Sequence, residues 1–183
     1  MDSPEVRAPA PGRLIVPAAR IATRIAELAS EIDAAYAGVD GAVILLCVLK
    51  GSLFFTADLA RALTIPVEID AIAVRSYGAG TETAGTVQLV KDVTTPLVGR
   101  HVLMVEDVID TGLTTSFLYE HVARHRPASL RLVSLLDKPG RRRREVRIDF
   151  RGFVLGDEFV VGYGLDIGER FRNLPGVHAL DHG

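Results

Sequence analysis

The sequence predicts an α/β fold in which a mainly parallel, twisted sheet is flanked by helices. Residues 42–49, AVILLCVL, form an unbroken apolar run, which is typical of a strand that is covered on both faces. Similar runs alternate along the chain with segments of helical periodicity, and this alternation favours parallel pairing of the strands. The chain has 183 residues, of which 48% are hydrophobic, so it can form one domain with a full core.

The chain is expected to begin with an arm and a helix. Residues 1–13 contain prolines among alanines and are predicted to form a flexible N-terminal arm, which leaves residues 14–183 as a single domain. Pro17 is suited to the start of a helix, and Gly38 is suited to its end. Between them, apolar side chains recur at steps of three and four: Ile21, Ile25, Leu28, Ile32 and Tyr36.

The middle of the chain alternates between strand and helix patterns. After the strand at residues 42–49, residues 53–63 return to helical spacing, and a strand with period-two character is expected at 67–74. Residues 76–85, SYGAGTETAG, are rich in glycine and threonine and are expected to be a flexible segment. Residues 87–93 then resume strand character.

The second half continues this alternation. We expect strands at residues 101–105 and 130–136, with a helix at about 115–125 between them. A further strand is expected at 147–155, and glycine-broken turns over residues 156–177 finish the domain.

A cluster of acids follows the strand at residues 101–105. Glu106, Asp107 and Asp110 lie within five positions, and a turn rich in glycine and threonine comes next. Burying a carboxylate is costly unless it is paired or bound to a metal. Ligands of open parallel sheets bind beyond the carboxyl ends of the strands, so we expect these acids to face a binding crevice.

The turn after the acids has the chemistry of a phosphate site. It leads into a helix, whose N-terminus offers unpaired N–H groups and a partial positive charge. Gly112 lets the backbone approach an anion closely, and the neighbouring threonine hydroxyls add donors. The paired acids suit sugar hydroxyls or a magnesium ion. Together these features predict a site for a phosphorylated ribose.

A simpler interpretation is that Asp110 caps the following helix and that DTG is an ordinary turn. Three acids between a buried strand and a glycine–threonine turn make this interpretation the less favoured one. Two better-known phosphate motifs are absent from the sequence, because G-x-x-x-x-G-K-[ST] does not occur and residues 76–85 lack G-x-G-x-x-G spacing.

The segment VLMVEDVIDTGLTT closely resembles the phosphoribosyl pyrophosphate signature of type I phosphoribosyltransferases. The segments LKGS, SYG, LLDKP and DEFVVGYGLD, with FR at residues 171–172, resemble the branch that acts on 6-oxopurines, the hypoxanthine-guanine phosphoribosyltransferases of bacterial type. The resemblance extends over about residues 15–177. It implies the type I phosphoribosyltransferase fold, with a small hood and a flexible lid loop beside the sheet.

The resemblance also implies roles for individual residues. Glu106 and Asp107 would hold the ribose hydroxyls, directly or through Mg²⁺, and Asp110 would act as the general base toward N7 of the purine. The residues expected around the 5′-phosphate are Asp110, Thr111, Gly112, Leu113, Thr114 and Thr115.

The pyrophosphate and lid contacts follow in the same way. The residues expected at the pyrophosphate are Leu49, Lys50, Gly51 and Arg172. The bond between Leu49 and Lys50 matches the place where the family carries a non-proline cis peptide. Ser76 and Tyr77 would begin the lid loop, which closes over the site and excludes water from the activated sugar.

The purine site is expected to come from the last third of the chain. Lys138 would contact O6 of the base, Phe159 would stack on its ring, and the backbone at Val160 would meet its far edge. Asp166 would also face the base and serve a second magnesium ion. The residues expected to hold metal are therefore Glu106, Asp107 and Asp166.

The implied activity is purine salvage. The 5-phosphoribosyl group of phosphoribosyl pyrophosphate would pass to N9 of hypoxanthine or guanine, and pyrophosphate would be released. A cationic Lys138 favours an oxo group over the amino group of adenine, because an amino group is a donor. Uracil and orotate enzymes share the acidic motif but lack the purine segments, whereas xanthine differs from guanine only at position 2.

A second hypothesis is a non-catalytic regulator that keeps the phosphoribosyl pocket and binds nucleic acid through the arginine run, residues 141–144. The net charge of −2 argues against it, so a nucleic-acid partner is not expected. The simpler interpretation of the arginine run is a solvated hairpin tip. The alternative is a contact with an anionic partner, such as a regulatory nucleotide at a subunit interface.

Two further features receive the simpler interpretation. His121 and His125 are spaced to bind a metal on one helix face. Because Arg124 and Arg126 flank His125 and no third ligand is near in sequence, we expect a solvent-exposed pair. The only cysteine, Cys47, lies in an apolar run and is expected to be a buried thiol.

The sequence shows neither a signal peptide nor an apolar run of membrane-spanning length, so a cytoplasmic protein without a membrane partner is expected. The resemblance implies a homodimer or homotetramer.

Overall fold

The computed structural model describes residues 10–76 and 87–181. Its main feature is a six-stranded sheet in the order β4-β3-β2-β5-β6-β7. All neighbouring strands are parallel except β3 and β4, which are antiparallel, so the predicted mainly parallel sheet is confirmed. The strands are β2 (Val43–Leu49), β3 (Val67–Ser76), β4 (Val87–Lys91), β5 (His101–Ile109), β6 (Ser129–Asp137) and β7 (Phe150–Val154).

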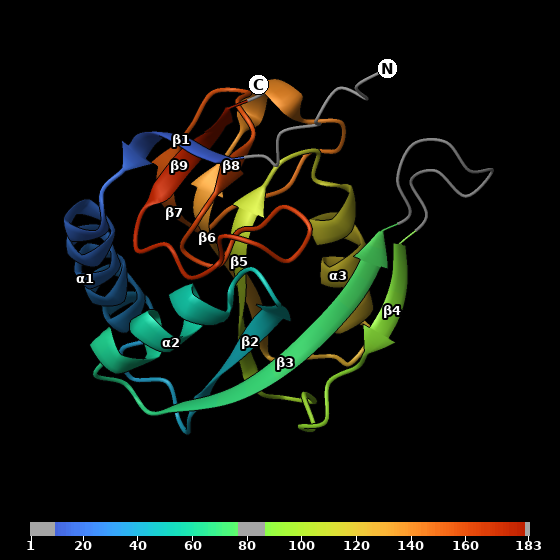
Figure 1. Cartoon of the computed structure of the whole chain (residues 1–183). Coiled ribbons are helices and arrows are strands. Elements are labelled where there is room, and N and C mark those ends of the chain that lie inside the picture. The colour runs from blue at the N-terminus through green and yellow to red at the C-terminus, as the bar shows by residue number, and fades with distance from the viewer. Residues whose placement is uncertain (1–9, 77–86, 182–183) are drawn as a thin grey trace, which may run out of the picture.

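Helices cover both faces of this sheet (Figure 1). Helices α1 (Ala18–Ala35) and α2 (Leu53–Ala62) lie on one face, and α3 (Leu113–Ala123) lies on the other. One 3-10 turn, η1 (Pro139–Arg141), follows β6. The predicted helical spacing in α1 is confirmed, because its apolar positions are the buried ones. None of the described helices combines the length and the apolarity needed to cross a bilayer.

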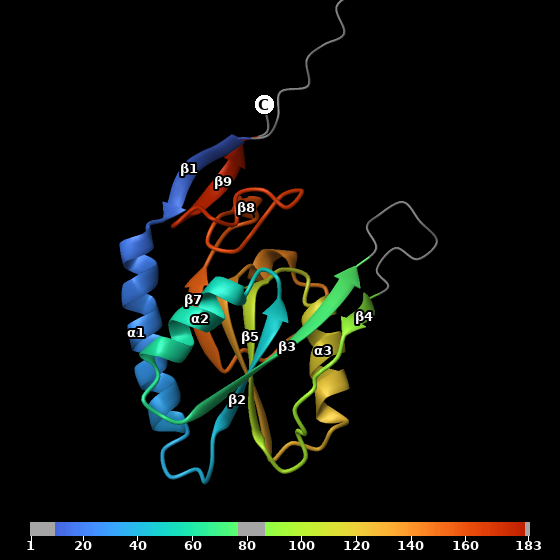
Figure 2. The same ribbon diagram turned by 60° about the horizontal axis from the view of Figure 1, so that its bottom comes forward.

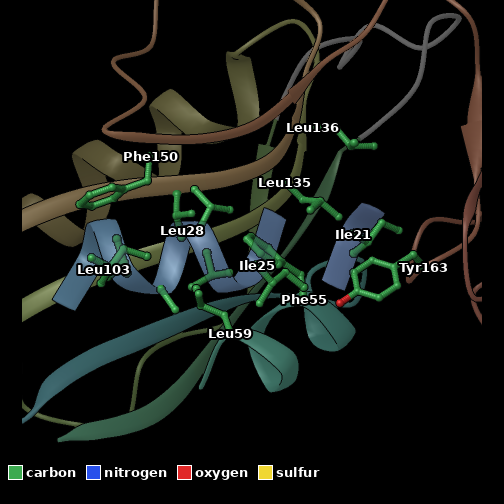
Figure 3. Close-up of a cluster of buried hydrophobic side chains, with 14 of the residues drawn as sticks. Ile21, Ile25, Leu28, Phe55, Leu59, Leu103, Leu135, Leu136, Phe150 and Tyr163 are labelled. Carbon is green, nitrogen blue, oxygen red and sulfur yellow. The ribbon is translucent and has the colours of Figure 1, made fainter. Parts of the chain in front are cut away.

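Strand β2 explains how one apolar run serves two cores. Successive side chains of a strand point to opposite faces, so Leu45 packs with α1 and α2 while Ile44 and Leu46 pack in the cluster that contains residues of α3. Figure 3 shows the first cluster, in which Phe55 of α2 lies beside residues of α1. The residue next to it, Phe54, is not a core residue, since it is 42% exposed.

A smaller antiparallel sheet, β1-β9-β8, forms a hood over the end toward which the parallel strands point (Figure 2). Its strands are β1 (Ala10–Val16), β8 (Val160–Val161) and β9 (Val177–Asp181). Strand β1 begins inside the predicted arm, so residues 10–13 belong to a strand and not to a loose segment. Pairing with β9, more than 160 residues away in the sequence, holds them there.

The end of β5 also differs from the expected end at residue 105. The strand continues to Ile109, because β6 remains paired with it from His101↔Ser129 to Ile109↔Asp137. The acids Glu106 and Asp107 therefore lie in the last part of a strand and not in the turn after it. Helix α3 correspondingly begins at Leu113, two residues before the predicted start.

Candidate active site

A cleft of about 270 Å³ lies between the carboxyl ends of β2 and β5 and the start of α3. This is where an open parallel sheet binds its ligands. The cleft brings together most of the predicted site residues: Leu49, Lys50, Gly51, Glu106, Asp107, Asp110, Thr111, Gly112, Thr114, Thr115, Asp166 and Arg172. Of the expected purine residues, Asp166 lines the cleft, whereas Lys138, Phe159 and Val160 do not. Leu113 does not line it either. Ser76 ends β3, while Tyr77 and the rest of the expected lid loop, to residue 85, lie outside the described residues.

The turn after β2 forms one wall of the cleft. The peptide bond between Leu49 and Lys50 is cis, as the family resemblance implies. Gly51 packs so closely against Asp107 that a Cβ at this position would overlap the Asp107 carboxylate. The absence of a side chain at Gly51 therefore makes room for one of the two neighbouring acids.

Glu106 and Asp107 are held in a partly desolvated environment. Burial and the neighbouring Asp107 raise the pKa of Glu106 well above its usual range, although the hydroxyl of Thr115 donates to its carboxylate over 3.3 Å. Burial raises the pKa of Asp107 to about 6, against the opposing effects of nearby amides and Arg172. Two adjacent carboxylates that disfavour each other's charge provide a site for hydroxyl donors or a divalent cation.

The opposite wall is the phosphate loop, residues 110–115, which leads into α3. Gly112 has a φ of +79°, and a Cβ there would also overlap the backbone oxygen of Arg144, so only glycine fits. The first helical hydrogen bond runs from the Ser116 amide to the Gly112 oxygen, and no described side chain caps the helix. The Leu113 amide donates to the Thr111 hydroxyl over 3.4 Å, so the amides of Thr114 and Thr115 are the ones available to an anion.

The arginine run supports this loop. Three of its residues, Arg141, Arg143 and Arg144, are exposed to solvent as expected, but the segment is not a hairpin tip, because the strands that it connects, β6 and β7, are parallel. The amides of Arg143 and Arg144 both donate to the backbone oxygen of Thr111, over 2.9 and 3.0 Å. Arg142 is nearly buried and pairs with Asp137 at the end of β6. The run therefore fixes the backbone of the phosphate loop. The length of the run, unusual for a solvated turn, was the only sign of this role in the sequence.

Asp110 lies beside two cations. The Nε atom of Arg141 is 3.0 Å from its Oδ1 atom, in an ion pair that the sequence did not predict. The same oxygen accepts no hydrogen bond from the described residues, so it can still accept a proton. Burial lowers the pKa of the Lys138 ammonium, and the charge of Asp110 opposes this shift. Lys138 and Asp110 are thus close enough to act on one ligand.

The predicted purine residues lie between the large sheet and the hood. Lys138 is 4% exposed, and its ammonium donates to the backbone oxygen of Glu158 over 2.7 Å. Phe159, the next residue, is 42% exposed, and its ring is therefore available to a planar ligand. Val160 is buried and pairs with Ala179 of β9. The hood thus fixes the segment that follows Glu158.

Three ion pairs cross the mouth of the cleft. Arg172 contacts Asp166 over 2.9 Å and Glu169 over 3.2 Å, while Lys50 contacts Glu169 over 3.2 Å. The guanidinium of Arg172 also donates to the oxygen of Gly164. Glu169 therefore lies between the two cations predicted to bind pyrophosphate. Glu169 was not predicted from the sequence, although its position three residues before Arg172 was a signal.

The carboxylates of Glu106, Asp107 and Asp166 do not gather around one point in the described part of the chain. Asp166 is near enough to raise the pKa of Asp107. The donor set fits magnesium, because hard carboxylate oxygens face an open cleft in which the ion can keep water ligands. One ion could bind to the pair Glu106 and Asp107, and a second ion could bind to Asp166.

Comparison with known proteins gives one consistent result. Residues 15–167 match the phosphoribosyl transferase domain family. The chain is 43% identical to the hypoxanthine phosphoribosyltransferase of Salmonella typhimurium, over 90% of this chain and 92% of that protein. It is 44% identical to the hypoxanthine-guanine phosphoribosyltransferase of Mycobacterium avium, over 92% of this chain and 85% of that protein. The crystal structure of a hypoxanthine-guanine phosphoribosyltransferase from Bacillus anthracis is similar with a TM-score of 0.87 and 40% identity, covering 93% and 99% of the two chains.

Proposed function

Because the chain belongs to the phosphoribosyltransferase family, we propose that it transfers the 5-phosphoribosyl group of phosphoribosyl pyrophosphate to N9 of hypoxanthine or guanine. The observation that carries this proposal is the meeting of the phosphate loop with Glu106 and Asp107 in one cleft. Relatives of similar length, named for this activity, support it. The products are a purine nucleotide and pyrophosphate, so the reaction is one of purine salvage.

The phosphate loop binds the 5′-phosphate. The amides of Thr114 and Thr115 and the hydroxyls of Thr111 and Thr114 donate to its oxygens, while the Thr115 hydroxyl remains bonded to Glu106. Glu106 and Asp107 accept hydrogen bonds from the ribose hydroxyls. This arrangement holds C1′ of the sugar in place, and such positioning lowers the barrier to attack.

Asp110 acts as the general base. As the bond between N9 and C1′ forms and the bond from C1′ to the pyrophosphate oxygen breaks, Asp110 takes the proton from N7 of the purine. Its Oδ1 atom has no hydrogen-bond donor among the described residues, which leaves it ready to accept that proton. A negative charge at this place also favours the cationic sugar of the transition state.

Magnesium is the cofactor that the acids fit. Glu106, Asp107 and Asp166 would hold it, and it would neutralise charge on the leaving pyrophosphate. Lys50 and Arg172 stabilise the same leaving group. In the free protein both cations pair with Glu169, so pyrophosphate replaces Glu169 as their partner.

Lys138 selects the base. It is buried, and its ammonium can donate to an oxo group at position 6 but not to an amino group. Phe159 offers an apolar face for stacking, which is worth about 1–3 kcal/mol for bases in other proteins. These contacts exclude adenine more strongly than they exclude xanthine.

The test is a competition assay. The protein is incubated with phosphoribosyl pyrophosphate, Mg²⁺ and equal amounts of hypoxanthine, guanine, xanthine and adenine, and the nucleotides formed are separated and counted. We expect products from hypoxanthine or guanine and none from adenine. No turnover with any 6-oxopurine would refute the proposal.

Oligomeric state and location belong to the same proposal. We expect a homodimer or homotetramer, as the family resemblance implies, and Leu53 and Phe54 of α2, which are 51% and 42% exposed, could contribute to a subunit contact. Light scattering after gel filtration measures the mass directly. We place the reaction in the cytoplasm, since its phosphorylated substrate and products do not cross membranes unaided. The relatives are named as enzymes, which argues against the nucleic-acid-binding regulator.

A further inference from the structure

Away from the cleft, three metal-ligating side chains from two segments meet at the β4 edge of the large sheet. Asp92 directly follows β4, while His121 lies in the last turn of α3 and His125 lies just beyond it. One ligand atom from each residue lies within 4.8 Å of the other two. Figures 1 and 2 both place the segment after β4 alongside α3.

The third ligand, Asp92, is distant from the two histidines in the sequence, but the fold brings it next to them. Asp92 precedes His121 by 29 residues, and the antiparallel return of β4 along β3 brings it to the helix. Both histidines are only partly exposed. The expectation of a solvent-exposed pair without a third ligand is therefore wrong.

The distances suit a small cation. The Nε2 atom of His121 is 2.9 Å from the Oδ1 atom of Asp92, and the rings of His121 and His125 have centroids 5.4 Å apart. Ligand atoms on a tetrahedron with bonds of about 2.0–2.2 Å lie about 3.3–3.6 Å apart. The three ligand atoms lie within 4.8 Å of one another, so binding would draw the more distant ones closer together.

Neighbouring residues hold the ligand side chains and their backbone in place. The amide of Val93 donates to the Asp92 carboxylate over 2.8 Å. The next two amides, those of Thr94 and Thr95, donate to the buried carboxylate of Asp70 over 2.7 and 2.8 Å. On the helix, the ring of Phe117 stacks on that of His121 with an interplanar angle of 13°. Ligands held in this way by their surroundings bind metal more tightly than mobile ones.

The neighbouring cation does not neutralise the carboxylate of Asp92. The ammonium of Lys91 donates to the backbone oxygens of Ala71 and Asp92, and it forms its ion pair with Asp70. The carboxylate of Asp92 therefore faces the two imidazoles.

We propose that Asp92, His121 and His125 bind one Zn²⁺ ion, with water as the fourth ligand. Two imidazoles and one carboxylate form a ligand set that zinc takes, whereas magnesium and calcium prefer oxygen ligands alone. The ion joins the segment after β4 to the C-terminal end of α3, the helix whose other end carries the phosphate loop. It stabilises this connection and takes no part in the transfer reaction.

Cobalt is the probe that tests this site. Untagged protein is freed of metal with a chelator and titrated with Co²⁺ in excess Mg²⁺, which occupies the carboxylates of the cleft. We expect the intense visible bands of four-coordinate cobalt, and their loss when Zn²⁺ is added. Asp92→Asn and His121→Gln should each weaken Co²⁺ binding by more than about 100-fold, the upper effect of merely supporting residues. The exposed Asp40 provides the control, and Asp40→Asn should bind as the parent does.

Circular dichroism checks that each variant is folded. A second measurement needs no variant, because the imidazole ring-proton signals of His121 and His125 should shift on adding Zn²⁺ while those of His101 and His178 stay in place. Parent protein without the cobalt bands, variants that bind as the parent does, or zinc shifts absent from the pair would each overturn the proposal. None of these readouts depends on enzymatic turnover, so the two proposals fail separately.

Discussion

Asp110 combines an ion pair with Arg141 and an oxygen that receives no hydrogen bond from the described residues. We expect Asp110→Asn to lower turnover by about 10²–10⁴-fold, because an amide cannot take the proton from N7. The affinity for phosphoribosyl pyrophosphate should stay nearly unchanged, since the backbone amides of the phosphate loop remain. Steady-state kinetics and a separate binding titration measure the two effects. Asp40→Asn is the matched control, and equal turnover in the two variants would remove Asp110 from its proposed role.

Gly51 allows a sharper test of the same site. Gly51→Ala should lower turnover by about 10²-fold, because its Cβ must displace the carboxylate of Asp107 and small misplacements in a site cost that much. Circular dichroism should show an intact fold. The same substitution in a chain that already carries Asp107→Ala should cause no further loss. Additive losses in the double variant would mean that Gly51 acts on something other than Asp107.

Individual site residues could be predicted from the sequence where they belong to a continuous motif. Glu106, Asp107 and Asp110 lie in the cleft as predicted, because strand, turn and helix follow one another directly in the chain. Glu169 and Arg141 were missed, since each acquires its role from a residue elsewhere in the sequence. A single charged residue carries no local sign of a partner that is distant in the sequence, as Lys50 is from Glu169.

Among the elements, β3 and the segment after β4 are joined by one buried side chain. Both carboxylate oxygens of Asp70 accept backbone amides, from Ala71 on one side and from Thr94 and Thr95 on the other. Asp70→Asn would place the NH₂ group of the side-chain amide, which is a donor, opposite one of these backbone donors. We expect it to lower the free energy of unfolding by about 1–3 kcal/mol at neutral pH, the range for a buried group left unsatisfied.

The pH dependence follows from the same contacts. Burial opposes ionisation of Asp70, but the surrounding amides lower its pKa far below the usual value. The folded state therefore binds fewer protons than the unfolded state, and the stabilisation is full above about pH 4 and is lost as the pH falls below that value. Urea unfolding at pH 7 and pH 3 should show a smaller difference between parent and variant at pH 3. A difference that is equal or larger at pH 3 would contradict this.

Element positions were predictable, but their ends and long-range pairings were not. Apolar runs located the strands of the large sheet, and periodicity located the helices. The end of β5 is set by its ladder with β6. The backbone position of the arginine run is set by its hydrogen bonds to the phosphate loop. Such contacts join residues that no local pattern connects.

For the whole molecule, the proposed sugar phosphate and base together would touch both sheets, since the phosphate loop adjoins the large sheet while Phe159 adjoins the hood. Phosphoribosyl pyrophosphate with Mg²⁺ at about 100 times its Kd should stabilise the fold by about 2.7 kcal/mol. For a chain of this size that is a rise of about 5–10 °C in Tm. Thermal unfolding with and without ligand measures it, and ribose without phosphate is the control. An unchanged Tm at saturating ligand would mean that the sugar phosphate does not bind the folded protein.

The fold class and the single large sheet were predictable because they depend on alternation along the chain. The hood strands were not located, since β8 has only two residues and β1 pairs across almost the whole sequence.

The position of the hood strands in the sequence also affects the order in which the protein folds during synthesis. Strand β9 lies between β1 and β8 and is made after every strand of the large sheet. A chain emerging from the ribosome can therefore assemble its sugar-phosphate site while the place for the base is still unfinished. The hood part of the proposed purine site, which includes Val160, would form only after β9 has left the exit tunnel and paired with β8.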